Sequence, residues 1–254
     1  MSTYLVPAIS TRPPAEPKTV YTIANGDLRL TTNVKTWAMQ QQVEGEFAAA
    51  LESLGWQVSR AHGVNPATGH GFIDSQRMGM TVFRNVPKDA PLVVVEAVWQ
   101  YSHHVLHGLR DHQGPILLVA NFAGDFPGLV GMLNLHGSMV KAGIKHSTLW
   151  SKDFTDEWAR TRLAQWIETG EIVHDTSHVR DLPALPASPE KELGEALAAQ
   201  LKEEKAIIAV FDEYCMGMYN ALIDDELMNP AGIYKERLSQ SALVAEMNKV
   251  SDEE

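Results

Sequence analysis

The sequence predicts an α/β fold in which an open, mainly parallel sheet is covered by helices on both faces. Two runs of branched apolar residues, 92–95 (LVVV) and 116–120 (ILLVA), are typical of strands buried on both faces. After the second run, four apolar residues recur at helical spacing: Leu129, Leu133, Met139 and Val140. Gly143 ends this predicted helix and separates it from a further extended piece at 144–150. This alternation of strands and helices indicates a three-layer sheet of the Rossmann or flavodoxin-like kind.

The chain before this stretch contributes elements to the same sheet. Residues 1–20 contain four prolines and predict an extended lead-in that ends in a strand at 19–23. A helix is predicted between residues 36 and 54, with Gly55 as its stop, because one face collects apolar side chains: Val43, Phe47, Ala50, Leu51 and Leu54. A strand at 56–60 and a turn-rich segment at 61–71 follow.

The chain after residue 150 predicts one more helix and then a linker. Asp153 is expected to cap a helix that Gly170 ends and that carries four apolar residues on one side: Trp158, Leu163, Trp166 and Ile167. Residues 172–188 lose this periodicity. We therefore predict an N-terminal α/β domain over 1–171, a linker over 172–188 and a second region over 189–254.

The second region starts like another α/β domain. Ser188, Pro189 and Glu190 form a helix start, followed by an apolar face made of Leu193, Leu197 and Leu201. A strand at 206–211, a loop around 229–232 and a last helix at 235–249 complete the prediction. One strand and two helices cannot build a sheet with both faces covered. We expect 189–254 to be the incomplete start of a second domain, with these leucines exposed.

Composition narrows the class of protein. The 254 residues include 21 basic and 32 acidic ones, a formal net charge of −11, and the basic residues form no stripe. A nucleic-acid partner is therefore not expected. A single cysteine, Cys215, fits a reducing compartment. The N-terminus lacks an apolar span of membrane-crossing length, so we expect a soluble cytoplasmic protein with no membrane partner.

Aromatic residues follow the first buried run. Trp99 and Tyr101 lie just beyond it, where parallel sheets gather ligands and where aromatic faces stack well on sugars. Met216 and Gly217 follow the predicted strand of the second region, and the glycine permits a close approach. Packing between the two regions is the alternative interpretation of these residues.

Other motifs give weaker indications. His103 and His107 are four residues apart and would share one side of a helix, as a metal site requires. No third ligand has usable spacing, so a solvated helix start is the favoured interpretation. The chain has no GxSxG, GxGxxG or GxxxxGK[ST] motif.

Three pieces of the chain resemble the L-fucose isomerase family, whose relatives include L-arabinose isomerase. Residues 215–221 (CMGMYNA) and 232–240 (GIYKERLSQ) look like the Met-Gly loop and the following helix near the start of that family's second domain. Residues 98–101 (VWQY) look like the place of its pocket tryptophan. Outside these pieces the resemblance, which spans most of 30–250, depends on the order of elements.

The resemblance implies an aldose–ketose isomerase that uses Mn²⁺ and assembles as an oligomer, with its active site between subunits. Trp99 and Met216 match pocket-lining positions, and Tyr101 joins them as a predicted substrate-binding residue. The family's metal ligands lie further along its chain, so we assign no catalytic residue or metal ligand and expect no metal bound by this chain alone. We therefore expect this chain to be the N-terminal region of such an enzyme and to be inactive alone. Its expected ligand is a small sugar substrate. We also expect that the chain either forms a homo-oligomer or lacks a C-terminal portion. The alternative is a non-catalytic sugar-binding or assembly module.

Overall fold

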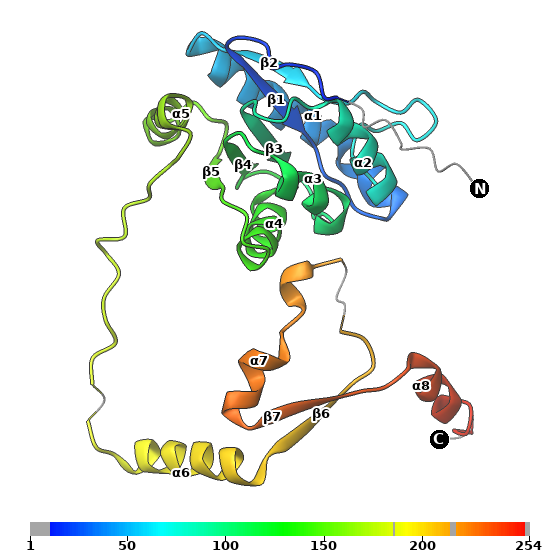
Figure 1. The fold of residues 1–254 in the computed structure, drawn as a ribbon, viewed down its shortest axis with the longest axis vertical. Helices are drawn as coiled ribbons and strands as arrows, with labels where there is room; N and C mark the ends of the chain where they lie inside the picture. The colour runs from blue at the N-terminus through cyan, green and yellow to red at the C-terminus, as the bar shows by residue number, and fades with distance from the viewer. Residues whose placement is uncertain (1–10, 185, 214–216, 252–254) are drawn as a thin grey trace, which may run out of the picture. The chain divides into compact units, whose positions relative to one another are not determined.

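A computed structural model describes residues 11–184, 186–213 and 217–251, and the chain divides into two units (Figure 1). The first unit comprises the chain up to Val173 together with Gly217–Asn220. The second unit comprises His174–Met216 and the residues from Ala221 onward.

The first unit contains a five-stranded parallel sheet with the strand order β2-β1-β3-β4-β5. The strands are β1 (Thr19–Ile23), β2 (Gln57–Arg60), β3 (Leu92–Glu96), β4 (Ile116–Asn121) and β5 (Ser147–Ser151). Every residue of β3 and β4 is buried. The predicted fold class is confirmed, with the two branched apolar runs as inner strands.

Helices cover both faces of this sheet (Figure 1). One layer consists of α2 (Gln76–Asn85), α3 (Leu106–Asp111) and α4 (Leu129–Lys141), and the other of α1 (Leu30–Ser53) and α5 (Glu157–Thr169). Successive residues of a strand point to opposite faces. Val94 accordingly packs under the first layer and Val95 under the second. This alternation explains why each inner strand is a continuous apolar run.

Two predicted helix starts are wrong. Helix α1 begins at Leu30 rather than at residue 36, because buried Asn33 secures its first turn by donating from Nδ2 to the Asp27 carbonyl at 2.8 Å. Helix α5 is capped by Asp156, whose Oδ1 accepts from the Ala159 N–H at 2.8 Å. Asp153 instead closes the preceding turn by accepting from the Thr155 N–H at 3.1 Å.

The buried face of α4 also differs from the prediction. Leu133 and Val140 are 51% and 61% exposed, whereas Met132, Leu135 and Met139 are buried against the sheet. The helix ends where predicted, with Gly143 at φ 67°. A residue without a side chain adopts this left-handed conformation without strain.

The second unit contains a two-stranded parallel sheet, β6 (Ala206–Val210) and β7 (Ile233–Arg237), with helices α6 (Pro189–Glu204) and α8 (Gln240–Met247). The single helix predicted over 235–249 is therefore wrong, because its first residues form β7. Arg237, the last residue of β7, pairs with Glu213 and Asp225, each at 2.9 Å. The expected exposure is observed for Leu193 and Leu197, at 60% and 54%, whereas Leu201 is half-buried.

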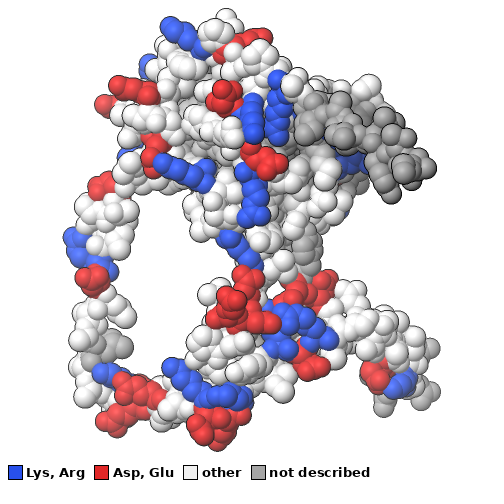
Figure 2. All heavy atoms as spheres, in the orientation of Figure 1, with Lys and Arg blue, Asp and Glu red and all other residues white. Residues whose placement is uncertain are grey.

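The charged side chains of the second unit are mixed in sign. Along α6, Lys side chains lie among Glu side chains, as Figure 2 shows at the position that Figure 1 gives for this helix. Lys191, for example, lies 3.8 Å from Glu195. In the part of the chain that the structure describes, no helix has both the length and the apolar character to span a bilayer.

Candidate ligand site at the carboxyl edge of the sheet

Three loops of the first unit meet at the carboxyl edge of the sheet, where the strand order reverses. The chain runs from β1 outward to β2 on one side, and from β3 outward to β4 on the other. Open parallel sheets bind their ligands at such a switch point. A cavity of about 360 Å³ lies here, between the start of α1, the residues after β3 and the β4–α4 loop; its lining includes Thr31, Thr32, Lys35, Trp99, Asp125 and Phe126.

The buried side chain of Gln40, from α1, fixes the path of the chain as it leaves β3. Its Nε2 donates to the Val95 carbonyl at 2.9 Å, and its Oε1 accepts from the Ala97 N–H at 3.0 Å. Both backbone groups are buried and would otherwise lack a partner there. This clamp sets where Trp99 emerges from the sheet.

Asn121 organises the opposite wall of the cavity. At the end of β4, its Nδ2 donates to the Ala123 carbonyl at 2.8 Å, and its Oδ1 accepts from the Gly128 N–H at 2.9 Å. A Cβ atom on Gly128 would lie 1.8 Å from the Glu96 carbonyl oxygen. A glycine is therefore required here for the start of α4 to press against the end of β3.

Trp99 is half-buried and lines the cavity, as a pocket role requires. Its indole nitrogen is buried and has no hydrogen-bond partner among the described residues. Lys35 Nζ lies 5.6 Å from the ring centre of Phe126. The cavity thus combines an aromatic wall, threonine hydroxyls, an ammonium group and a carboxylate, a set that suits a small polar ligand with apolar faces.

Tyr101 lies outside this cavity lining, although it is only two residues away from Trp99. Its carbonyl accepts from Asn25 Nδ2 at 3.0 Å, and its N–H donates to the Gly26 carbonyl at 3.0 Å. Its ring stacks on His104 with centroids 5.6 Å apart. The structure therefore does not bring Trp99 and Tyr101 to one cavity. Met216, the third predicted substrate-binding residue, lies outside the described residues.

His103 and His107 do not share a helix, contrary to the spacing argument. His103 belongs to the 3₁₀ turn η1 (Ser102–His104), and His107 belongs to α3. Burial lowers the pKa of both imidazoles. Both line a second cavity, of about 450 Å³, together with Tyr219. Over residues 11–184, 186–213 and 217–251, no three His, Cys, Asp or Glu side chains are grouped as metal ligands.

Glu96, the last residue of β3, is a buried acid. The side chain is fully buried, and within the described residues neither carboxyl oxygen has a hydrogen-bond partner. Burial raises its pKa well above the usual value, because the fold disfavours the charged form of a carboxyl group that is removed from solvent. No sequence pattern signals this environment, because it depends on how α4 covers the strand.

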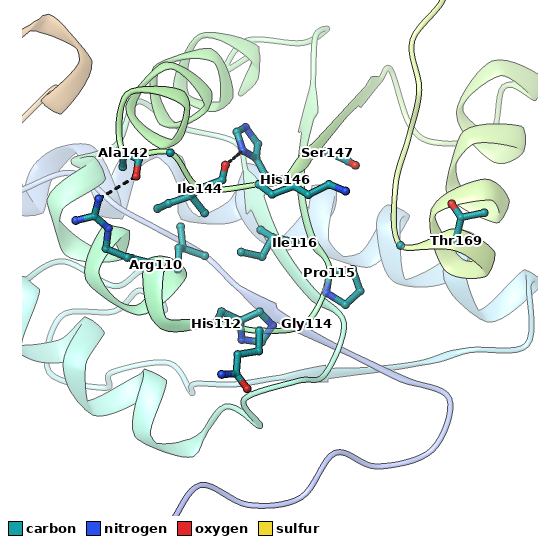
Figure 3. Close-up of a pocket in the computed structure, with 15 residues that line it drawn as sticks. Arg110, His112, Gly114, Pro115, Ile116, Ala142, Ile144, His146, Ser147 and Thr169 are labelled. Carbon is teal, nitrogen blue, oxygen red and sulfur yellow. Dashed lines mark hydrogen bonds between the residues drawn. The ribbon is translucent and has the colours of Figure 1, made fainter.

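A larger cavity, of about 570 Å³, lies at the opposite edge of the sheet (Figure 3). Two hydrogen bonds fix its walls: Arg110 Nη2 donates to the Ala142 carbonyl at 2.9 Å, and the His146 ring bonds the Ile144 carbonyl at 2.8 Å. The ends of α3 and α4 and the starts of β4 and β5 surround it. Open parallel sheets bind their ligands at the carboxyl edge. We therefore favour the cavity of about 360 Å³ beside Trp99 as the ligand site.

No model of a known protein family and no curated protein matches this chain. A function for this chain can therefore only be proposed, from the geometry above and from the sequence resemblance of residues 98–101, 215–221 and 232–240.

Proposed function

We propose that the first unit forms one wall of a sugar site, in the N-terminal region of a cytoplasmic aldose–ketose isomerase of the L-fucose and L-arabinose isomerase type. The observation that carries the proposal is the position of Trp99, half-buried at a cavity at the switch point of a parallel sheet. A large apolar ring left partly open to solvent favours a site that a ligand or a partner covers.

The chemistry of the cavity suits a monosaccharide. An indole face stacks on the C–H face of a sugar ring, and the hydroxyl groups of Thr31 and Thr32 can exchange hydrogen bonds with sugar hydroxyls. Lys35 and Asp125 add a donor and an acceptor. The volume of about 360 Å³ falls in the range of small-molecule sites.

The isomerase reaction itself is supported by the resemblance alone. In that family a bound Mn²⁺ polarises the substrate oxygens. The described residues of this chain do not offer a ligand set that fits this ion. The role we propose for Trp99 is therefore binding and orientation of the sugar, with no proton-transfer step assigned to the described residues.

Calorimetric titration of the chain with L-fucose and L-arabinose tests the proposal. Trp99→Ala is expected to weaken binding about tenfold, since a lost stacking face costs on the order of 1–2 kcal/mol. Trp56→Ala is the matched control, because Trp56 is also half-buried but precedes β2 at the other edge of the sheet. Equal affinities for wild type and Trp99→Ala, or no binding of either sugar by the wild type, would count against the proposal.

A further inference from the structure

Four residues from late in the chain complete the first unit. Gly217–Asn220 belongs to this unit, although the surrounding chain does not. The segment contacts two places that are far apart in the sequence: the residues around η1, and helix α4. We call the surface made by Tyr101, Ser102, His103, Gly137, Ser138 and Lys141 the docking surface.

Two buried serines hold the segment by the same arrangement. Ser102 Oγ donates to the Gly217 carbonyl at 3.0 Å and accepts from the Tyr219 N–H at 3.3 Å. Ser138 Oγ donates to Asn220 Oδ1 at 3.2 Å and accepts from the Asn220 N–H at 3.3 Å. Both serines are 0% exposed. Each hydroxyl thus uses its donor and an acceptor on the segment, an arrangement that requires one register.

The fit at Gly217 excludes any side chain. Gly217 has φ +73°, and a Cβ atom there would lie 1.8 Å from Cδ1 of Tyr101. No rotamer change at residue 217 relieves such a clash, because the Cβ position is set by the backbone. The Tyr101 ring would have to leave its stack on His104.

Tyr219 and Asn220 complete the contact. The Tyr219 ring meets the edge of His103 with centroids 5.8 Å apart, and Lys141 Nζ lies 5.0 Å from its centre. Asn220 packs closely on Gly137, where an added Cβ would come within 3.0 Å of Nδ2. The docking surface therefore contacts the segment through main-chain hydrogen bonds, the Tyr219 ring and the side-chain amide of Asn220.

We propose that the docking surface is a specific peptide-binding site whose occupant is the chain's own Gly217–Asn220, and that its occupation orders the loop carrying Trp99. Tyr101 is held on one side by Asn25 and Gly26 and on the other by Gly217. Release of the segment removes the second support, so that residues 99–102 are held only by the hydrogen bonds of Gln100 and Tyr101 to Asn25, Gly26, Gly131 and Asn134 and open more often. Trp99, two residues before Tyr101, is then positioned less firmly. The inference does not depend on the identity of the ligand in the Trp99 cavity.

Hydrogen exchange on the full chain tests this coupling. Gly217→Ala is expected to speed exchange at the Tyr219 and Asn220 amides and, about tenfold or more, at the amides of residues 99–102. Gly55→Ala is the matched control: Gly55 has φ +78°, but an added Cβ there meets no atom within 4 Å. The control therefore carries the same backbone strain without the clash, and exchange at 99–102 should stay at the wild-type rate.

Ser138→Ala supplies an independent variant should Gly217→Ala fail to fold. It removes both bonds to Asn220 without touching Tyr101. Faster exchange at 219–220 together with 99–102 supports the proposal. Faster exchange at 219–220 with unchanged exchange at 99–102, in either variant, overturns the coupling. Unchanged exchange at 219–220 in both variants overturns the docking site itself.

Discussion

The side chain of Gln40 substitutes for a neighbouring strand at the end of β3, where its Oε1 accepts a 3.0 Å hydrogen bond from the Ala97 N–H. The same side chain donates to the Val95 carbonyl at 2.9 Å. Helix α1 is thus bonded to the exit of the central strand and not merely packed on it. The candidate site depends on this bond, because Trp99 follows two residues after Ala97.

Gln40→Met should be strongly destabilising. The substitution keeps the length of the side chain but leaves the Val95 carbonyl and the Ala97 N–H buried without a partner. Each orphaned group costs about 1–3 kcal/mol, so we expect a loss of about 2–6 kcal/mol in the free energy of unfolding, measured by urea denaturation. Gln42→Met, on the exposed side of the same helix, is the control and should change stability by less than about 0.5 kcal/mol. Similar losses in the two variants would contradict the clamp.

Trp99 and Trp166 should respond differently to truncation. Trp166 is 1% exposed within the core between α5 and the sheet, so Trp166→Ala is expected to cost about 3–5 kcal/mol of stability. Trp99 is half-buried at a cavity, and Trp99→Ala should cost less than about 2 kcal/mol. Melting temperatures and urea midpoints of the two variants compare them directly. A loss of stability in Trp99→Ala as large as that in Trp166→Ala would show that Trp99 is a core residue and not part of a ligand site.

Glu96 should make stability fall as pH rises. Its pKa in the folded protein is raised by burial above the ordinary 4.5, so above pH 4.5 the folded state binds more protons than the unfolded state. The free energy of unfolding then decreases with pH by up to about 1.4 kcal/mol per pH unit until the folded pKa is reached. Glu96→Gln removes this dependence. Its stability relative to wild type should therefore grow as the pH rises above 4.5, and a difference independent of pH would show that the pKa of Glu96 is not raised in the folded protein.

The purified chain is expected to show no aldose–ketose conversion with Mn²⁺. This expectation follows from the resemblance, which places the metal ligands of the family beyond the matching residues. A colorimetric ketose assay with L-fucose and L-arabinose measures it. Turnover that disappears on addition of EDTA would overturn the expectation and would require a metal site within these residues.

The strands were predictable where burial on both faces leaves a plain apolar run, as at Val94 and Leu118. The helix starts were harder. The first turns of α1 bury polar residues, Asn33 and Thr36, while Leu30 and Val34 are about half exposed, so the apolar period begins only later. Helix α2 was not predicted, although Ser75 caps it by accepting from the Met78 N–H at 3.3 Å.

Strand β7 shows the limit of local patterns. Its residues, IYKER, have the polarity of an exposed helix, and pairing with β6 makes them a strand.

The candidate site, too, could be predicted only in part from local sequence patterns. Trp99 was predicted from its place after an apolar run, but Gln40 bonds residues 55 and 57 positions away. No spacing rule connects such residues, because only the packing of α1 on β3 brings them together.

Amide chemical-shift mapping of the labelled chain during titration with L-fucose tests the location of the site most directly. We predict shifts at residues 31–36, 97–99 and 125–126, which surround the carboxyl-edge cavity, and their loss in Trp99→Ala. Residues 110–114 and 142–146, at the amino-edge cavity, serve as the internal control and should stay unchanged. Shifts confined to the amino-edge residues, or none at saturating sugar, would contradict a sugar site at Trp99.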